Sequence, residues 1–333
     1  MDRKLNYQHV FETIVNTTSK YITSYGIKGM VLGLSGGLDS TVCAAICSKV
    51  CQLTGIPLHG ISLPCSTNKE SENNSALLAG KEFCNTFDVT NLQDIYESSN
   101  NFCKNIVPSF EPTNISKGNI KARLRMITLY DIASRIGGIV IGTSNTTERL
   151  TGFWTLHGDE GDINPIGDLW KTEVYGLAKY LLENVFKDSD ALKTAIEITP
   201  TDGNGVSNSD ADQIMPGYTY NDIDAILKVW DGLSPKVKEK MAFDKLTDSI
   251  KGTVFEPEHD EERRKRIEYC KKCGEEFKEH IGTIYGIDNI RKVIFRVLKT
   301  EYKRNRGELY ISINGPLEGK IVLSSNMPKE FII

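Results

Sequence analysis

The feature that most constrains the fold is a short apolar run followed at once by a glycine turn and a helix. Residues 29–34 read GMVLGL, which is typical of a buried parallel strand, and residues 35–41 read SGGLDST. Gly36 and Gly37 have no Cβ, so the backbone can turn sharply there and approach a ligand closely. The helix expected over 39–54 offers unpaired N–H groups and the positive end of its dipole to an anion. The junction therefore predicts a phosphate-binding loop.

The polar side chains of this loop narrow its chemistry. Ser35, Ser40 and Thr41 supply hydroxyl donors. Asp39 would repel a bare phosphate, so its presence indicates a Mg²⁺ ion between the two. The Walker pattern and the G-x-G-x-x-G fingerprint are both absent, so this is not a standard P-loop. The alternative is an ordinary glycine turn with Asp39 or Ser40 near a helix N-cap.

Strands and helices alternate along most of the chain. We expect helices over 5–25, 39–54, 70–85, 116–136, 171–184 and 220–231, and strands over 29–34, 58–63, 87–92 and 137–143. This order predicts an α/β fold of Rossmann-like type, in which a doubly wound, mostly parallel sheet is covered by helices on both faces. A helical C-terminal extension is expected to follow it.

Shifts in composition suggest how the chain is divided. Residues 1–231 form the expected main domain. Within it, residues 200–218 are rich in Gly, Asn, Asp and Ser and are expected to form a long loop, either a lid over a site or a disordered surface loop. Residues 232–290 are expected to be an inserted helical subdomain, strongly charged over 252–282. Residues 291–333 would then return to the main domain.

Charge and hydropathy exclude several classes of protein. The 40 Lys and Arg residues nearly balance the 44 Asp and Glu residues, so no overall positive field exists to bind nucleic acid or an anionic membrane. No apolar run approaches the roughly eighteen residues of a transmembrane helix. The N-terminus MDRKLNYQHVFETIV lacks the apolar block of a signal peptide. We therefore expect a cytoplasmic protein whose eight cysteines are reduced.

The cysteines could carry chemistry of their own. Cys43, Cys47 and Cys51 recur at helical spacing, which is compatible with sulfur or metal chemistry. Packing as small buried hydrophobic groups against the sheet is the favoured interpretation. Cys270 and Cys273, with two histidines nearby, have the spacing of half a zinc site, but the surrounding sequence is helical and a structural role is favoured.

Two further stretches point to an anionic ligand and a cation. In 118–130, three cations lie near the start of the expected helix, where they oppose its dipole, so a polyanionic ligand would explain them better than helix stability does. They are Lys121, Arg123 and Arg125.

In 139–171, a strand ends at the carboxyl edge of the sheet, where open α/β sheets bind ligands, and acidic residues follow the strand. These residues are Gly142 and Thr143, then Glu148, Asp159, Glu160 and Asp162. The alternatives are a surface basic cluster and a solvated acidic loop.

These motifs together resemble known enzymes. SGGLDS resembles the pyrophosphate-binding loop of the N-type ATP pyrophosphatases. The later stretches resemble the patterns G-N-x-K-A-R-x-R-M, G-T-x-x-x-x-E and T-G-F-x-T-x-x-G-D of the NAD synthetases, in the same order. The resemblance implies an adenine nucleotide alpha hydrolase-like fold. It also implies ATP-dependent amidation of deamido-NAD⁺ to NAD⁺, the last step of NAD biosynthesis, through an adenylated nicotinate and with release of AMP and pyrophosphate.

The resemblance also implies roles for individual residues. Binding of ATP would involve Gly33, Ser35, Gly36, Gly37, Asp39, Ser40, Thr143, Lys171 and Thr201. Binding of deamido-NAD⁺ would involve Asn119, Arg123, Tyr130, Phe153 and Asp159. Asp39 and Glu148 would contact Mg²⁺, and the catalytic residues would be Asp39, Asp159 and Lys171. The family commonly builds its dinucleotide site at a dimer interface, so a homodimer is expected.

The chain departs from the family pattern in places. The family often has Arg-Leu-Pro where this chain has Ser62-Leu63-Pro64, so another group must replace an arginine that contacts ATP. The loop before Asp162 is one residue shorter than usual. Only thirty-four residues precede Ser35, which leaves no room for an amidase domain, so the expected nitrogen source is free ammonia or ammonia from a separate partner.

Two other functions are compatible with parts of the sequence. One is a different ATP pyrophosphatase, such as an enzyme that thiolates tRNA, which would need a basic surface or catalytic cysteines. The net charge of −4 opposes it. The other is a regulatory protein that binds ATP without turning it over. The retained Asp39, Glu148 and Asp159 oppose this reading.

Overall fold

The computed structural model describes residues 5–200, 210–214, 217–232, 292–294, 296–297, 299–300, 309–311 and 321–323. Its main sheet has four strands: β1 (Met30–Gly33), β2 (Leu58–Ser62), β3 (Thr86–Val89) and β4 (Ile139–Ile141). The strand order is β3-β2-β1-β4 and every pairing is parallel. The predicted α/β class with a parallel sheet is confirmed.

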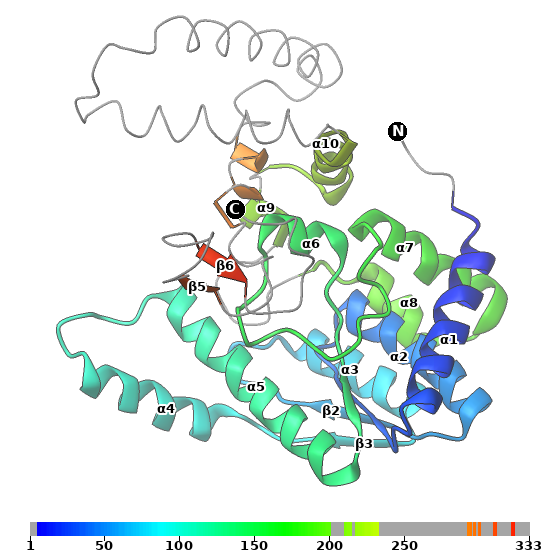
Figure 1. Ribbon diagram of the computed structural model, residues 1–333, viewed down its shortest axis with the longest axis horizontal. Helices are drawn as coiled ribbons and strands as arrows, with labels where there is room; N and C mark the ends of the chain where they lie inside the picture. The colour runs from blue at the N-terminus through cyan, green and yellow to red at the C-terminus, as the bar shows by residue number, and fades with distance from the viewer. Residues whose placement is uncertain are drawn as a thin grey trace, which may run out of the picture.

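Helices cover both faces of this sheet (Figure 1). The helices before the β4 strand are α1 (Tyr7–Ser24), α2 (Leu38–Thr54), α3 (Glu70–Phe83), α4 (Gln93–Ile106) and α5 (Asn114–Ile136). Alternate residues of β1 divide between the faces, since Met30 and Leu32 pack with α1, α2 and α3 whereas Val31 packs with α5. Because side chains on a strand alternate in direction, both faces need an apolar cover, and the doubly wound arrangement supplies it.

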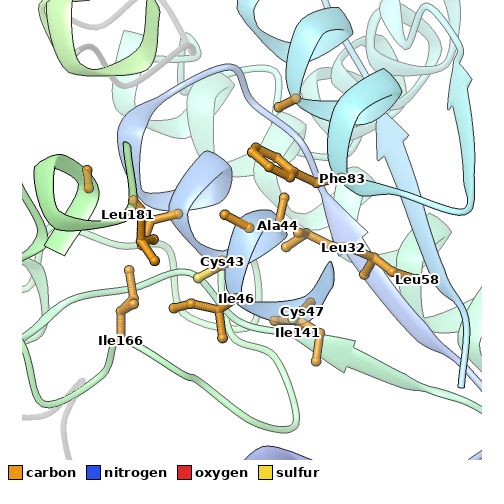
Figure 2. Packing of buried hydrophobic residues seen from close by; sticks show 14 of the residues in the cluster. Leu32, Cys43, Ala44, Ile46, Cys47, Leu58, Phe83, Ile141, Ile166 and Leu181 are labelled. Carbon is orange, nitrogen blue, oxygen red and sulfur yellow. The ribbon is translucent and has the colours of Figure 1, made fainter. Parts of the chain in front are cut away.

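The core is centred on α2, the helix that follows the glycine turn (Figure 2). Cys43 and Cys47 are fully buried there, beside Ile46 and near Leu32 of β1. Burial raises the pKa of the thiols of Cys43 and Cys47 above the ordinary value, so both stay protonated. The cysteine row of α2 therefore serves as packing, as the favoured interpretation had it.

A second apolar cluster lies apart from the sheet and is formed by α9 (Asp210–Ile214), α10 (Tyr220–Gly232) and helical residues within 292–300, and Leu150 of α6 (Thr146–Thr151) packs against it. We call α9, α10 and the helical residues within 292–300 the helical cap. Its buried members include Ile223, Leu227, Val293 and Val297. Helix α7 (Lys171–Tyr180) contacts both α2 and α10, so it joins the cap to the sheet core. In Figure 1, α6, α9 (Asp210–Ile214) and α10 lie together above the strands.

Several elements differ from the sequence expectation. Helices α4, α6 and α8 (Asp190–Glu197) were not predicted, nor were the antiparallel strands β5 (Leu309–Ile311) and β6 (Ile321–Leu323). The helix expected over 171–184 is formed by α7 and the π-helical segment η1 (Leu181–Val185). Helix α9 lies in the segment expected to be a loop. The sequence of helix α4 is amphipathic, but the helix buries none of its residues, so most of its large apolar side chains are exposed.

Some predictions fall outside the described residues. These are Thr201, the metal hypothesis for Cys270 and Cys273, and the charged helix over 252–282. The division into three domains stays a prediction. In the described part of the chain, no helix combines the length and the apolar character needed to cross a membrane.

Candidate functional site

A cavity of about 400 Å³ opens at the carboxyl edge of the sheet. Its lining begins with the residues after β1 and β2 and continues with Thr143, which follows β4. It then takes in residues of the 152–159 segment, Lys171 at the start of α7, and Arg296 of the helical cap. The sheet places these segments together because the carboxyl ends of parallel strands share one edge.

Glycine is required at the turn itself. Gly36 has φ +83°, a left-handed conformation that side-chain-bearing residues avoid, and a Cβ there would overlap the carbonyl oxygen of Glu72 on α3. Gly37 forms the N-cap of α2 without a side-chain cap, so no side chain covers the first amides of the helix. Those amides and the helix dipole are available to an anion.

The serines of the loop hold its shape. Ser35 Oγ accepts a hydrogen bond from Gly37 N (3.2 Å) and lies 3.1 Å from Ser40 Oγ. The hydroxyls of Ser40 and Thr41 donate to Gly37 O at 3.1 and 3.0 Å. All these bonds join residues of one short segment, so the loop is pre-organised by local sequence.

Opposite the loop, Asp39 meets groups from two distant helices. Lys171 Nζ forms an ion pair with Asp39 Oδ2 and lies 3.6 Å from Glu148 Oε1. Asn145 Nδ2 donates to Asp39 Oδ1 at 2.9 Å. Lys171 is 2 % exposed, and burial by itself lowers its pKa, but Asp39 and Glu148 outweigh burial and hold the pKa well above its ordinary value. Lys171 is therefore a fixed positive charge between two carboxylates.

The same carboxylates fit Mg²⁺. Among the described residues no cluster of three or more His, Cys, Asp or Glu side chains could hold a metal by itself. Magnesium is usually held by one or two carboxylates together with substrate phosphates, and Asp39 and Glu148 next to the phosphate loop match that donor set. The Lys171 ammonium between them shows that this position attracts a cation.

A buried carboxylate behind Lys171 organises the start of α7. Asp224 of α10 is 1 % exposed and accepts hydrogen bonds from the hydroxyl of Thr147 and from Thr172 N. Thr147 Oγ1 accepts in turn from Lys171 N at 3.0 Å. Trp170, at the N-cap, makes no side-chain cap bond. Asp224 therefore caps α7 from another helix and ties it to α6, which carries Glu148.

The far end of the cavity joins other residues of the sequence analysis. Thr155 lies between two of them, because its hydroxyl donates to Asn119 Oδ1 (2.8 Å) and its amide donates to Asp159 Oδ2. Phe153 lines the cavity beneath the guanidinium of Arg296, whose carbon is 5.6 Å from the ring centroid. The structure thus brings Asn119, Phe153 and Asp159 into one cavity with the phosphate loop.

Two expected dinucleotide residues do not line this cavity. Arg123 is exposed and donates to Leu156 O at 3.2 Å. Tyr130 is 40 % exposed, and its hydroxyl lies 3.3 Å from Glu160 O and from Asp162 Oδ1. The helix begins at Asn114, so the three cations occupy its second and third turns, not its start. They point in different directions, since Lys121 is buried against Thr67.

Most of the other residues expected to bind ATP or Mg²⁺ line the cavity, whereas Gly36 of the loop does not. Those that line it are Gly33, Ser35, Gly37, Asp39, Ser40, Thr143, Glu148 and Lys171. Ser62, which replaces the family's arginine, lines it too, and the cation at this end is Arg125, whose Nε donates to Leu63 O (3.1 Å).

Sequence reasoning missed Asn145, Asp224 and Arg296. Asn145 could have been found, since Asn145 and Glu148 form a capping box, with the side chain of Asn145 accepting from Glu148 N, and N-x-x-E is the sequence signal of such a box. Asp224 and Arg296 carry no local signal because their partners come from other helices.

Comparisons with known proteins show the family of this chain. The family described as NAD synthase matches residues 10–263. An NH(3)-dependent NAD(+) synthetase from Carboxydothermus hydrogenoformans is 35 % identical over 69 % of this chain and 88 % of its own. One from Thermococcus kodakarensis is 32 % identical over 77 % and 96 %. The solved structure of NMN synthetase from Francisella tularensis is 31 % identical, with a TM-score of 0.59 over 77 % of this chain and all of its own.

Proposed function

The chain belongs to the NAD synthase family, and from that premise we propose that it is a ligase that amidates deamido-NAD⁺ to NAD⁺ with ATP and ammonia. One observation carries the proposal. A single cavity joins the phosphate loop, the Asp39–Lys171–Glu148 cluster and the Phe153–Asp159 end. A nucleoside triphosphate on the phosphate loop and an aromatic carboxylate beside Phe153 and Asp159 would therefore share one cavity.

The first proposed step activates the carboxylate. Ammonia cannot displace oxide, so a carboxylate oxygen of the nicotinate attacks the α-phosphorus of ATP, pyrophosphate leaves, and an acyl adenylate forms. The protein contributes positioning and charge, with the α2 amides and the hydroxyls of Ser35 and Ser40 on the phosphates and Lys171 on the departing pyrophosphate. Mg²⁺ bound by Asp39 and Glu148 would neutralise phosphate charge.

The second proposed step forms the amide. Ammonia attacks the acyl carbon, AMP leaves, and one proton is lost from nitrogen. Asp159 lines the cavity and would hold the ammonium ion and accept its proton. The segment that contains Thr201 would exclude water from the adenylate, and this role stays a prediction, as do the cytoplasmic location and the use of free ammonia.

The exposed surface of α4 and α5 supports a homodimer. Large apolar side chains are exposed on these helices and on the segment between them, namely Ile95, Phe102, Ile106, Val107, Phe110, Ile115 and Ile127. Helix α4 has no buried residue, and it lies beside α5 at one side of the ribbon in Figure 1. Arg123 and Tyr130, on α5 but outside the cavity, would be covered by a partner at the same surface. Sedimentation should show a dimer for the wild-type chain and a monomer for Phe102→Glu.

A second candidate substrate is the mononucleotide. The Francisella tularensis relative is titled NMN synthetase. Arg123 and Tyr130, two of the expected dinucleotide contacts, do not line the cavity of the single chain. Nicotinate mononucleotide carries the same ring carboxylate, so the same two steps would yield NMN.

One assay separates these possibilities. AMP is measured from ATP with Mg²⁺ and ammonium, in the presence of deamido-NAD⁺, of nicotinate mononucleotide, or of neither. Equal amounts of AMP and NAD⁺, formed only with the dinucleotide, support the proposal. Preference for the mononucleotide moves the chain to the second candidate. ATP binding without AMP under any condition would place it in the regulatory class.

A further inference from the structure

The cavity contains a cation that the proposed mechanism does not use. Arg296 lines the cavity together with Phe153 and Asp159, and its guanidinium carbon lies 5.6 Å from the centroid of the Phe153 ring. It comes from the helical cap, more than a hundred residues after either of them in the sequence. Gly152, next to Phe153, has φ +63°, and a Cβ there would overlap Thr300, so the segment that carries Arg296 packs closely against the cavity wall.

Two backbone carbonyls fix the guanidinium. Arg296 Nε donates to Thr151 O and Nη1 donates to Gln213 O, both at 2.9 Å. Its face lies over the ring of Phe153. These bonds use two of the five N–H donors of an arginine and neutralise none of its charge. The side chain is thus oriented, and part of its donor capacity is left for another acceptor.

The surroundings supply no counter-charge. Within the part of the chain that the structure describes, no Asp or Glu oxygen lies within ion-pair distance of Arg296, whereas Lys171 has two such carboxylates. Burial lowers the pKa of Arg296, and among the described residues Tyr220 alone raises it. Within that part of the chain, Arg296 is a half-buried cation with no carboxylate partner.

A substrate carboxylate that enters this cavity needs such a cation. The wall already carries the acids Asp39, Glu148 and Asp159, and Lys171 is engaged by two of them. We infer that Arg296 binds the ring carboxylate of the substrate and so distinguishes the acid from its amide product. The inference rests on the proposed function and holds for either candidate substrate. The planar fork of arginine suits a carboxylate, and the charge is of no use to a neutral amide.

The test compares ligands that differ only in that group. Deamido-NAD⁺ and NAD⁺ share every phosphate and ribose, so affinities for both are measured by calorimetry, together with KM for ATP. Arg296→Gln should lower the affinity for deamido-NAD⁺ by about tenfold to a hundredfold, the usual effect of losing a hydrogen bond to a charged group. The affinity for NAD⁺ and the KM for ATP should each stay within about twofold of the wild-type values. Arg296→Lys, which keeps the charge without the fork, should lie between. Lys292→Gln is the matched control, since it removes an exposed cation from the same segment.

Other outcomes would overturn the inference. An equal loss of affinity for deamido-NAD⁺ and NAD⁺ would mean that Arg296 contacts the part that the two ligands share. A higher KM for ATP alone would mean that Arg296 binds a phosphate of ATP. Wild-type affinities for both dinucleotides and for ATP would mean that the side chain only caps α6. If Arg296→Gln no longer binds ATP, the Arg296→Lys variant decides on the same ratio. A wild-type chain that forms neither NAD⁺ nor NMN would count against the proposed function, whereas the ratio tests Arg296 alone.

Discussion

The two walls of the cavity are built in different ways. On the sheet side, the loop from Ser35 to Thr41 makes its hydrogen bonds within a few residues of itself. On the other side, Asp39 pairs with Lys171 across 132 positions, and Asp224 of α10 holds the helix that carries Lys171. The comparison teaches that the shape of the phosphate loop is a local property, whereas its charge environment depends on how three helices pack.

The strongest test of the side of the cavity that carries Asp39, Lys171 and Glu148 is removal of the Lys171 ammonium. Lys171→Met leaves Asp39 and Glu148 without the ammonium between them, so we expect kcat to fall by about 10²- to 10³-fold, the usual cost of losing one preorganised electrostatic group. Lys179→Met, on the exposed side of the same helix, should keep wild-type kcat. Steady-state release of AMP measures both, and wild-type turnover in Lys171→Met would contradict the assignment.

The phosphate loop on the sheet side of the cavity is tested at Gly36. Gly36→Ala adds a Cβ that must overlap the carbonyl of Glu72, so the loop has to move, and we expect ATP affinity to fall by about tenfold or more. Gly55→Ala at the other end of α2 has the same kind of left-handed φ with no atom in the way. It should cost about 1 kcal/mol of stability and leave ATP binding intact. Calorimetry with ATP and urea unfolding separate the two effects, and equal behaviour of the variants would show that the contact with Glu72 is unimportant.

Loss of the buried Asp224 carboxylate, which supports the helix that carries Lys171, should have a smaller effect. Asp224→Asn keeps one acceptor of two, so we expect a loss of about 1.5–3 kcal/mol of unfolding free energy and a decrease in kcat smaller than that of Lys171→Met. Burial raises the pKa of Asp224, so the stability linked to its proton is present at low pH and is lost as the pH rises above the ordinary value of 3.8. The difference between wild type and variant in urea unfolding should therefore shrink with rising pH.

The control for Asp224→Asn is on the same helix. Asp222→Asn changes a carboxylate that bonds only to Thr219 in an exposed position, so it should alter stability by less than about 1 kcal/mol. If both variants behave alike, the threonine–aspartate link between α6, α7 and α10 has no special role.

The smallest expected effect concerns two partly buried thiols far from the loop, Cys51 in the last turn of α2 and Cys84 at the end of α3. Burial raises the pKa of Cys51 to about 11 and that of Cys84 to about 12, against 9.0 for an ordinary thiol. The folded protein therefore keeps these protons after the unfolded chain has lost them, and stability should fall as the pH rises through 9 towards 11. Cys51→Ala should make this fall in Tm shallower, and Cys103→Ala, at an exposed position on α4, should not. Identical slopes would contradict the prediction.

Much of the fold could be predicted from patterns that are local. The apolar runs of β1 and β4 mark buried parallel strands, and their alternation with helices determines the class of fold. Helix α4 was missed although its apolar residues recur on one face, and the structure leaves most of these side chains exposed. Helix α9 was missed because a segment rich in Gly, Asn and Asp carries the signals of a loop.

The candidate site divides along the same line. Residues of contiguous motifs, such as Ser35, Asp39 and Asp159, were identified from the sequence and lie in one cavity. Arg123 and Tyr130 were identified too, but α5 turns them away from it. Their role as dinucleotide contacts stays a prediction that a partner subunit would complete.

What the sequence by itself determined is the strand–turn–helix junction, the parallel sheet and the family to which its motifs belong, because each depends on residues close together in the chain. Only the tertiary structure decided that Lys171 lies between Asp39 and Glu148, that Asp224 caps α7, and that Arg296 faces the cavity. The physical reason is burial: a charged group can be removed from water only where other elements supply its partners, and those partners are scattered along the sequence.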